Sequence, residues 1–452
     1  MVCRKSRSYK STPLIDFSNL DTKNELTAPI DEIDLTFSIS TIKKKSPGES
    51  GIGKELIKHL PSHFLKQIRY LYNANLASGY MPLCFKSAIT VLIPKKENTT
   101  DPKGFRPIAL LEILAKLYEI IIYRRLKWYL ELNGLLDESQ FGFRPGRSTH
   151  HVVNTLLNYI HTNRCRKRHV LMLSTDVEKA FDTVWREGLI YKLNLDIYMN
   201  LPDLILKLIA SYLTNRTIKI KYNNLISTPF TPEAGVPQGS VLAPLLYIMY
   251  LSDKPKVLRN TPDMETLNLH YADDNTILIS GNKQNLIDKA KKEIEQMAAF
   301  NTKWRIKINA AKSKILIFGK GRMAIGDKIK AKPITILPSH PSRVDQVIKV
   351  GNTHNILGIL FDNNLNFVQC IKRLKATMNR NRRSFLKFIP LSHKVRTFLY
   401  KCYLQPNILY HYPIYSFLSR RQRLNFQAMQ NNCLLHFVFT YKENGKMRAI
   451  KS

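Results

Sequence analysis

Residues 267–279 read LNLHYADDNTILI and place two adjacent carboxylates, Asp273 and Asp274, between apolar segments at 267–271 and 277–279. The flanking segments predict paired strands, so the carboxylates are expected at the tip of a hairpin. A hairpin tip fixes the backbone and exposes its side chains, which is the arrangement needed to hold a divalent metal ion. The same residues are also compatible with an ordinary turn, because Asp tolerates turn conformations. A second acidic site is therefore needed before the hairpin indicates chemistry.

Asp176 provides that second site. It follows residues 170–175, VLMLST, which predict a strand buried on both faces, and a helical pattern continues through Ile190 and Leu193. An aspartate between a buried strand and a helix lies at the edge of a sheet, where ligands bind, although Asp is also a common helix N-cap. Carboxylates from two strands could hold two cations roughly 3.5 to 4 Å apart, as two-metal nucleotidyl transfer requires. Hard oxygen ligands predict Mg²⁺ or Mn²⁺, and no His/Cys cluster in the sequence has the spacing of a zinc site.

Further motifs follow one another along nearly the whole chain. They are 46–52 (SPGESGI), 85–95 (FKSAITVLIPK), 104–108 (GFRPI), 140–149 (QFGFRPGRST), 174–184 (STDVEKAFDTV), 235–240 (GVPQGS), the 267–279 stretch, 309–318 (NAAKSKILIF) and 357–358 (LG). In this order the series resembles the reverse transcriptase domain of non-LTR retrotransposons, most closely the jockey-like group. The resemblance implies an α+β right-hand polymerase with fingers, a palm sheet carrying the catalytic aspartates, and a helical thumb.

The implied activity is that of an RNA-directed DNA polymerase. Such an enzyme extends the 3′ hydroxyl of a DNA primer on an RNA template with deoxynucleoside triphosphates. The resemblance makes Asp176, Asp273 and Asp274 the catalytic metal ligands. Neighbouring residues of a strand point to opposite faces, so Asp273 and Asp274 can both be full ligands only if the turn twists them together.

The resemblance also assigns side chains to the nucleotide and to the template. Phe181 would lie under the incoming sugar and exclude ribonucleotides sterically. Without the resemblance, Phe181 would be interpreted as a core residue. Cations at two finger positions would hold the triphosphate, although both also read as surface charge. The nucleotide contacts implied are Lys95, Arg106, Phe181, Gln238, Gly239 and Lys312, with Lys314 equally close in sequence to the last, and the template contacts are Arg144 and Arg147.

The charge of the chain agrees with a polyanionic partner. Its 452 residues have a formal net charge of +36, and residues 363–442 contain no Asp or Glu but fourteen Lys and Arg. Such one-sided charge indicates nucleic-acid binding. Five tyrosines between 400 and 415 are interleaved with it, and aromatic rings beside cations can stack on bases, although some of them also fit a core. The candidate nucleic-acid contacts in this segment are Arg373, Arg382 and Arg383.

Four segments are expected. Residues 1–40 read as a linker or the remnant of an upstream region, with organised sequence starting near Lys43. Residues 41–168 would be the fingers, with helices at 56–76 and 108–132, and residues 169–362 the palm. Residues 363–452 would form the basic helical thumb and C-terminal segment.

Two features depart from the family pattern. The first motif usually carries alanine and aspartate where this chain has Ser46 and Ser50. Elements of this type commonly encode an endonuclease ahead of the polymerase, and about forty residues precede the fingers here, so we expect a truncated element lacking its endonuclease. A catalytically inactive remnant that still binds nucleic acid is the alternative. Another palm polymerase, such as a maturase or an RNA-dependent RNA polymerase, fits less well because of Phe181.

Composition bounds the cellular context. No stretch reaches the roughly 18 uninterrupted apolar residues that a membrane span requires, and the six cysteines are scattered without close pairs. We therefore expect an intracellular soluble protein of the nucleus or the cytoplasm, without membrane association. The sequence does not indicate an oligomeric state.

Overall fold

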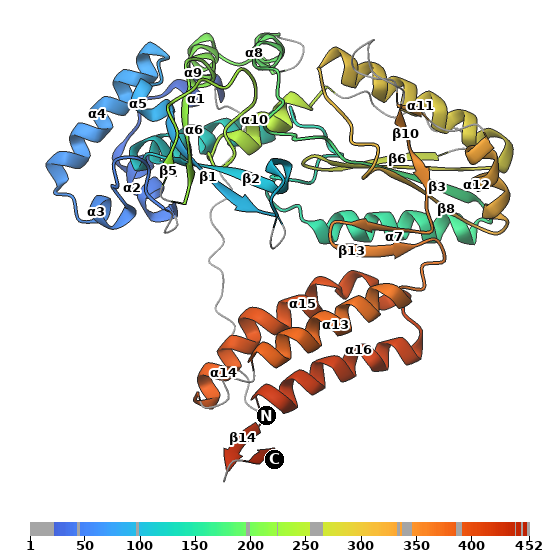
Figure 1. The fold of residues 1–452 in the computed structure, drawn as a ribbon. Coiled ribbons are helices and arrows are strands. Elements are labelled where there is room, and N and C mark those ends of the chain that lie inside the picture. Colours follow the sequence, from blue (N-terminus) through green and yellow to red (C-terminus); the bar gives the residue numbers. More distant parts are fainter. Residues whose placement is uncertain are drawn as a thin grey trace. The chain divides into compact units, whose positions relative to one another are not determined.

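The computed structural model describes residues 22–42, 46–95, 99–195, 199–223, 225–253, 265–331, 335–336, 346–385, 391–438, 440–443 and 446–449. The chain divides into two compact units, and both draw on separated stretches of the sequence (Figure 1). Unit 1 comprises Met1–Leu135, Arg186–Glu233 and Pro237–Leu245. Unit 2 comprises Leu136–Trp185, Ala234–Val236 and Leu246–Ser452.

Unit 1 is organised around helix α6, Ile113–Leu132, most of whose side chains are buried. The rings of Tyr72 and Tyr118 meet in its core with centroids 4.9 Å apart, and the Tyr72 hydroxyl donates to the Leu114 carbonyl at 2.7 Å. Because that hydroxyl is paired, the ring can be fully buried without an unsatisfied polar group. The other helices that lie within this unit are α1 (Thr22–Thr27), α2 (Glu32–Thr41), α3 (Lys54–Lys58), α4 (Ser62–Ser78), α5 (Leu83–Lys86), α8 (Arg186–Asn194) and α9 (Asp203–Leu213).

A four-stranded sheet completes unit 1. Its strand order is β2 (Phe105–Leu111), β1 (Ser87–Pro94), β4 (Thr217–Tyr222) and β5 (Leu225–Ile226). Strand β1 runs antiparallel to β2 and parallel to β4. The register of β1 and β2 places Arg106 opposite Ile93, two residues before Lys95. Both predicted triphosphate cations therefore lie beside the loop that connects these two strands.

The sheet of unit 2 has five strands in the order β11 (Lys349–Val350), β8 (Lys314–Phe318), β3 (His169–Thr175), β7 (Asp274–Gly281) and β6 (Glu265–Tyr271). Strand β3 is central and antiparallel to both neighbours. Helix α7 (Thr149–Cys165) covers one face and α11 (Lys283–Lys303) the other (Figure 1). Residues 170–173 are accordingly buried on both faces, as predicted.

The smaller elements of unit 2 connect the sheet to the C-terminal helices. Helix α12 (Arg322–Ala331) contacts β8 and β11. Strands β12 (Thr353–Ile356) and β13 (Ile359–Asp362) form a hairpin, and two further two-stranded pairs consist of β9 (Thr335–Ile336) with β10 (Gln346–Val347) and β14 (Thr440–Glu443) with β15 (Lys446–Ala449).

The basic segment is mostly helical, as predicted. It contains α13 (Val368–Phe385), α14 (His393–Leu399), a π-helical turn at Tyr400–Leu404, α15 (Gln405–Tyr410) and α16 (Arg420–Cys433). Helix α13 buries Cys370, Ile371, Leu374 and Met378 and exposes its cations. That spacing follows the helical repeat, so the apolar side chains form one stripe and the cations occupy the remaining surface.

Two of the helices expected from the sequence differ in the structure. The helix expected at 56–76 is split into α3 and α4, because Pro61 lies between them in an extended conformation and has no N–H to donate. The helix expected at 108–132 starts only at Ile113, since residues 105–111 pair with β1 as strand β2. Pairing with β1 therefore makes these residues a strand in spite of the local helical pattern.

The start of organised structure also differs from the expectation near Lys43, a residue that itself lies outside the described ranges. Residues 22–41 already contain α1 and α2, which contact α6. Arg125 forms an ion pair with Asp34 at 2.6 Å, and Asn73 accepts the Ile30 N–H at 2.6 Å. The segment also buries Leu26, Ile30 and Leu35, so it packs through apolar side chains as well as these polar contacts. The boundaries between linker, fingers, palm and thumb stay predictions.

The described cysteines, Cys84, Cys165, Cys370, Cys402 and Cys433, are free thiols. None of the helices in the described ranges is long and apolar enough to cross a membrane.

Candidate active site

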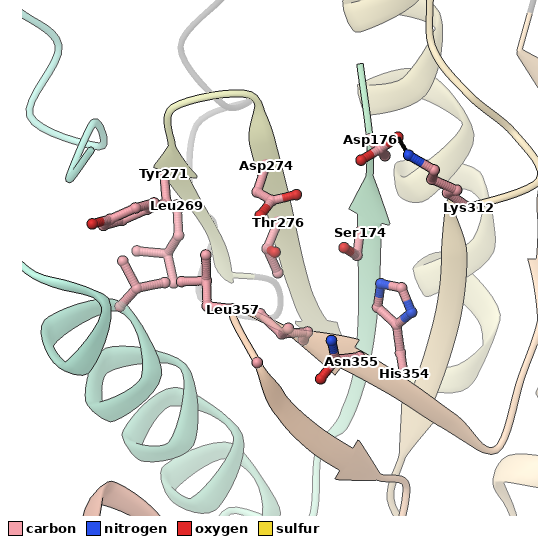
Figure 2. A pocket seen from close by; sticks show the side chains of 13 residues that line it. Ser174, Asp176, Leu269, Tyr271, Asp274, Thr276, Lys312, His354, Asn355 and Leu357 are labelled. Carbon is pink, nitrogen blue, oxygen red and sulfur yellow. Dashed lines mark ion pairs between the residues drawn. The ribbon is translucent and has the colours of Figure 1, made fainter. Parts of the chain in front are cut away.

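The register of the central strands brings two of the predicted carboxylates together. Thr175 of β3 pairs with Asn275 of β7, so Asp176 and Asp274 face each other one step further along. Directly opposed residues of an antiparallel pair share a face of the sheet. Both residues line a cavity of about 270 Å³ in unit 2, together with Ser174, Thr276, Lys312 and His354 (Figure 2).

The hairpin tip separates the two neighbouring aspartates. Tyr271 pairs with Asp274, which leaves Ala272 and Asp273 as a two-residue turn. Ala272 has φ +58°, the left-handed conformation that opens a tight hairpin turn. Asp273 is half-buried in the turn and does not line the cavity that Asp274 lines. The predicted hairpin is therefore confirmed, and the two carboxylates occupy different environments within it.

The electrostatics of the cavity disfavour a charged Asp274. Although the side chain is exposed at the end of β7, partial removal of its carboxyl from water raises its pKa to about 6, and the carboxylates of Asp273 and Asp176 act in the same direction. The ammonium of Lys312 opposes the shift. A carboxyl group whose pKa is raised by neighbouring carboxylates is typical of a site that binds a cation.

Lys312 supplies positive charge to this cavity. Its Nζ lies 3.1 Å from Asp176 Oδ2, and Figure 2 marks this ion pair. The turn that carries Lys312 is bonded to the end of β3, because Asn309 N–H donates to the Asp176 carbonyl at 2.8 Å and Asp176 N–H to Ser313 Oγ at 3.3 Å. Lys314 instead lies on β8 opposite Ser174. Of the two lysines that the sequence left open, Lys312 contacts the acidic site.

The donor set suits a hard divalent cation only in part. Asp176 and Asp274 offer carboxylate oxygens, the ligands that Mg²⁺ prefers. Within the part of the chain that the structure describes, no group of three or more His, Cys, Asp or Glu side chains is arranged to hold a metal ion. Two of the three expected ligands therefore share one cavity, and the third lies in the adjoining turn.

Phe181 lies in an aromatic group of unit 2. Its ring is 5.1 Å from that of Tyr247 and 6.3 Å from that of Phe143, and it is half-buried. The Phe181 carbonyl accepts the Val236 N–H at 2.8 Å. Gly235 has φ +87°, and a Cβ there would be 2.6 Å from the Asp182 carbonyl oxygen, so only glycine allows this approach. The backbone around Phe181 is thus held by residues 235–236 of the GVPQGS motif.

The rest of that motif belongs to unit 1 and packs on strand β2. The Gln238 carbonyl accepts the Ala109 N–H at 2.7 Å. Gly239 has φ +112°, and a Cβ there would be 2.6 Å from the Ala109 oxygen. Gln238 is half-exposed, whereas Lys95 and Arg106 are exposed. Unit 1 therefore holds Gln238 and Gly239 against the same strand that carries Arg106.

A buried carboxylate that sequence reasoning missed fixes this part of the motif. Glu119 of α6 is 1% exposed and accepts the N–H groups of Val241 at 2.6 Å and Leu242 at 3.3 Å. These amides precede α10 (Ala243–Tyr250), so the carboxylate caps the start of that helix. Burial raises the pKa of the Glu119 carboxyl, and the Arg216 guanidinium opposes the shift. Its only sequence signal is an acidic residue within an apolar helical run.

Sequence reasoning also missed a second carboxylate, that of Glu112, which contacts the altered first motif at residues 46–52. Glu112 accepts the Ser50 N–H at 2.9 Å and also bonds the Ser50 hydroxyl. Lys116, one turn further along, donates to the Ser46 carbonyl at 3.1 Å. The loop is thus pinned to the start of α6 with serine, and not aspartate, at position 50.

Both predicted template contacts, Arg144 and Arg147, form hydrogen bonds within unit 2. Arg144 Nη1 donates to the Asp137 carbonyl at 2.7 Å, and Arg147 Nη1 donates to the Gln140 carbonyl at 3.2 Å. The Arg147 guanidinium also lies 5.2 Å from the centroid of the Phe141 ring. Both side chains therefore order the loop before α7, and a guanidinium has further donors for a phosphate. Their role toward the template stays a prediction.

The candidate contacts on α13 point to solvent. Arg373 and Arg383 are exposed and Arg382 is half-exposed, on the surface left free by the buried apolar stripe. Of the interleaved tyrosines, Tyr400 is buried at 4% exposure, whereas Tyr403 and Tyr412 are 58% and 65% exposed. Tyr410 and Tyr415 are half-buried, so the five tyrosines comprise one core member, two half-buried rings and two that a ligand can reach.

Comparisons with known proteins agree with these motifs. The chain is 29% identical over 431 residues to a probable RNA-directed DNA polymerase from transposon BS of Drosophila melanogaster, covering 92% of this chain and 46% of that protein. It is 26% identical to the RNA-directed DNA polymerase from mobile element jockey of the same fly, covering 96% and 46%. The chain therefore spans about half the length of these relatives. A telomerase structure from Candida tropicalis is 15% identical, with a TM-score of 0.44, and covers 83% of this chain and 62% of that one.

The match to a protein family is more informative than the individual relatives. Residues 93–348, more than half of the chain, match the family described as reverse transcriptase (RNA-dependent DNA polymerase). The matched range contains the paired strands of the aspartate cavity and both parts of the GVPQGS motif. The predicted α+β right-hand polymerase fold and the resemblance to jockey-like and other non-LTR retrotransposon polymerases are confirmed. The chain belongs to the reverse transcriptase family.

Proposed function

We propose that this chain is an RNA-directed DNA polymerase that extends a DNA primer on an RNA template. The observation that carries the proposal is the meeting of Asp176 and Asp274 at the ends of paired strands, in one cavity with Lys312. This arrangement concentrates negative charge from separate strands at a solvent-accessible edge, with a cation beside it. Nucleotidyl transfer needs that arrangement, whereas a structural turn or a helix cap does not.

Reverse transcriptases use divalent metal ions. Asp176 and Asp274, with Asp273 in the adjoining turn, would hold Mg²⁺ or Mn²⁺ through carboxylate oxygens. When bound, such ions activate the primer 3′ hydroxyl and stabilise the leaving pyrophosphate. Above its pKa of about 6 the Asp274 carboxyl is ionised and can bind a cation. Synthesis should therefore fall as the pH drops through 6.

The remaining residues would act on the nucleotide. The ring of Phe181, held between Tyr247 and Phe143, would leave no room for a 2′ hydroxyl. Lys312 would donate a proton to the departing pyrophosphate, and its ammonium group beside Asp176 supports this role. Lys95 and Arg106 would bind the triphosphate, and Gln238 with Gly239 would contact the nucleotide from the loop on β2.

The template and primer would be held by distributed charge. Arg373, Arg382 and Arg383 lie outside the buried apolar stripe of α13, in a segment without acidic residues. Arg144 and Arg147 would add phosphate contacts beside the hairpin. Binding of this kind depends on the number of neutralised phosphates and weakens with salt.

The decisive experiment is extension of a DNA primer on an RNA template with Mg²⁺ and deoxynucleotides over a salt series. Asp273→Ala should abolish synthesis and leave primer–template affinity nearly unchanged. Asp288→Ala, which removes an exposed carboxylate of α11, is the matched control and should retain synthesis. No synthesis by the parent chain, with salt-sensitive binding retained, would identify a nucleic-acid-binding remnant instead.

A further inference from the structure

The side chain of Gln140 makes an unusual contact with the aspartate hairpin. Gln140 is 5% exposed, and its Oε1 accepts two backbone N–H groups, those of Gly142 at 2.8 Å and of Ala272 at 3.0 Å. Both partners are donors, so only the amide oxygen can face them, and the orientation of the side chain is determined. One buried oxygen thus joins the QFGFR motif to the turn that precedes Asp273.

That turn needs an external support. Tyr271 and Asp274 close the ladder between β6 and β7, which leaves the Ala272 N–H beyond the last strand pair. Ala272 is also 7% exposed and has φ +58°, a conformation that costs a residue with a Cβ roughly 1 kcal/mol or more. A buried N–H without a partner would add a further penalty. The Gln140 oxygen satisfies this group where the hairpin cannot.

The backbone around Gln140 is docked on the same hairpin. Phe141 N–H donates to the His270 carbonyl at 2.7 Å, and His270 N–H donates to the Ser139 carbonyl at 2.8 Å. A Cβ on Gly142 would lie 2.4 Å from the Ala272 nitrogen, so the two backbones touch. The Arg147 guanidinium holds the Gln140 carbonyl from the other side. Gln140 is therefore rigidly placed before it contacts Ala272.

We propose that Gln140 is a positioning residue that fixes the tip of the aspartate hairpin through Ala272 and so determines where Asp273 and Asp274 are held. Its effect on synthesis rests on the proposed polymerase function, whereas its effect on the hairpin does not. The sequence could have suggested it only through the place of Gln140 at the head of a motif.

Two variants separate the hydrogen bond from the shape of the side chain. Gln140→Met keeps the approximate volume but has no comparable acceptor, and Gln140→Glu keeps an oxygen that can accept both N–H groups. Tyr159→Phe is the matched control, because the hydroxyl of the half-buried Tyr159 donates to the Glu265 carbonyl at 2.7 Å, at the far end of β6. It removes one hydrogen bond from the same hairpin without touching the tip.

The first measurement is hydrogen exchange of peptides covering residues 265–281 in the absence of metal and nucleic acid. Gln140→Met should raise exchange at the tip by about tenfold, and Gln140→Glu should restore protection. Tyr159→Phe should raise exchange only near Glu265. Unchanged exchange at the tip in Gln140→Met would overturn the proposal whether or not the chain is a polymerase.

The second measurement is primer extension against Mg²⁺ concentration. Gln140→Met should lower kcat by about tenfold and raise the Mg²⁺ concentration needed for half-maximal synthesis, with KM for primer–template unchanged. Tyr159→Phe should change neither quantity by more than about twofold. An equal loss in both variants would reduce Gln140 to a general stabilising role. Absence of synthesis in the parent chain would refute the proposed function, while the exchange result would still decide the role of Gln140.

Discussion

The aspartate cavity and the basic helices α13 to α16 use charge in opposite ways. In the cavity a few charged groups are placed by strand register, and Asp176, Asp274 and Lys312 influence one another directly. On the helices many cations lie on exposed surfaces, in a segment without acidic residues. The difference indicates that chemistry depends on the position of single atoms, whereas affinity depends on how many charges are present. Changes in the two regions should therefore have separable effects.

Among the changes that compare these two regions, Asp176→Asn should have the largest effect. It removes a carboxylate from the cavity and the partner of Lys312, so kcat should fall by about a hundred- to a thousandfold or more. Primer–template affinity, measured by anisotropy with a labelled duplex, should change by less than about twofold. A comparable loss of affinity would show that the cavity and the basic helices are not separable.

Removing charge from α13 should give the reverse result. The combined change Arg373→Ala, Arg382→Ala and Arg383→Ala should weaken primer–template affinity by roughly ten- to a hundredfold. The slope of log affinity against log salt should fall by about 2 to 3, because three phosphate contacts are lost. At saturating primer–template, kcat should stay within about twofold of the parent value.

A matched control removes equal charge from unit 1. Lys58→Ala, Lys66→Ala and Arg69→Ala act on α3 and α4, outside the proposed contacts. If this control lowers the salt slope as much as the α13 variant, net charge governs binding and the basic helices have no special role.

A single ring should control the choice of sugar. Phe181→Ala should raise ribonucleotide incorporation relative to deoxyribonucleotide by roughly tenfold, measured as the ratio of the two kcat/KM values. The reason is steric, since the ring is held by its contacts with Tyr247 and Phe143. Tyr247→Phe keeps the supporting ring and should leave the ratio unchanged. An unaltered ratio in Phe181→Ala would assign that residue to the core alone.

The smallest expected effect is on stability. The folded-state pKa of Asp274, about 6, exceeds its ordinary value of 3.8, so the folded protein binds the proton more tightly than the unfolded chain. The charged carboxylate therefore destabilises the metal-free protein above pH 6, and this penalty disappears below about pH 4. Asp274→Asn should raise the free energy of unfolding by about 1 kcal/mol at pH 7, after allowance for solvent screening, and by about a fifth of that amount at pH 4.

Denaturant unfolding without metal at the two pH values measures this effect. Asp288→Asn, on the exposed surface of α11, should show no such pH dependence. A stabilisation by Asp274→Asn that is as large at pH 4 as at pH 7 would point to packing and not to charge repulsion.

Sequence reasoning predicted the elements whose signal is local. The buried strand before Asp176 and the aspartate hairpin follow from the spacing of apolar residues, and the structure confirms them as β3 and β6–β7. The motif order predicted the fold, and the family match confirms it. The local sequence pattern was sufficient for these elements, because packing against the neighbouring strands favours the same secondary structure as the local sequence does.

The contacts that span long stretches of sequence were beyond that reasoning. Glu119 reaches Val241, Gln140 reaches Ala272 and Glu112 reaches Ser50, and nothing in the spacing of the sequence predicts these partners. Residues 108–111 were mistaken for the start of a helix, because their pairing with β1 is not visible in the helical pattern of apolar residues. The roles of side chains were therefore predicted where the family resemblance assigns them. They were missed where a side chain acts through a contact that only the folded structure creates.

The hydrogen bonds between Ser50 and Glu112 affect which substitutions this loop can accept during evolution. An acid at position 50, the residue usual in the family motif, would place two carboxylates against each other, because Glu112 already occupies the contact. The acidic partner of this loop is thus carried by the helix in this chain. Restoring aspartate at position 50 alone should be harmful, and should become acceptable only after Glu112 has become neutral. A chain can therefore depart from its family motif and keep the loop in place, provided that the two positions change in the right order.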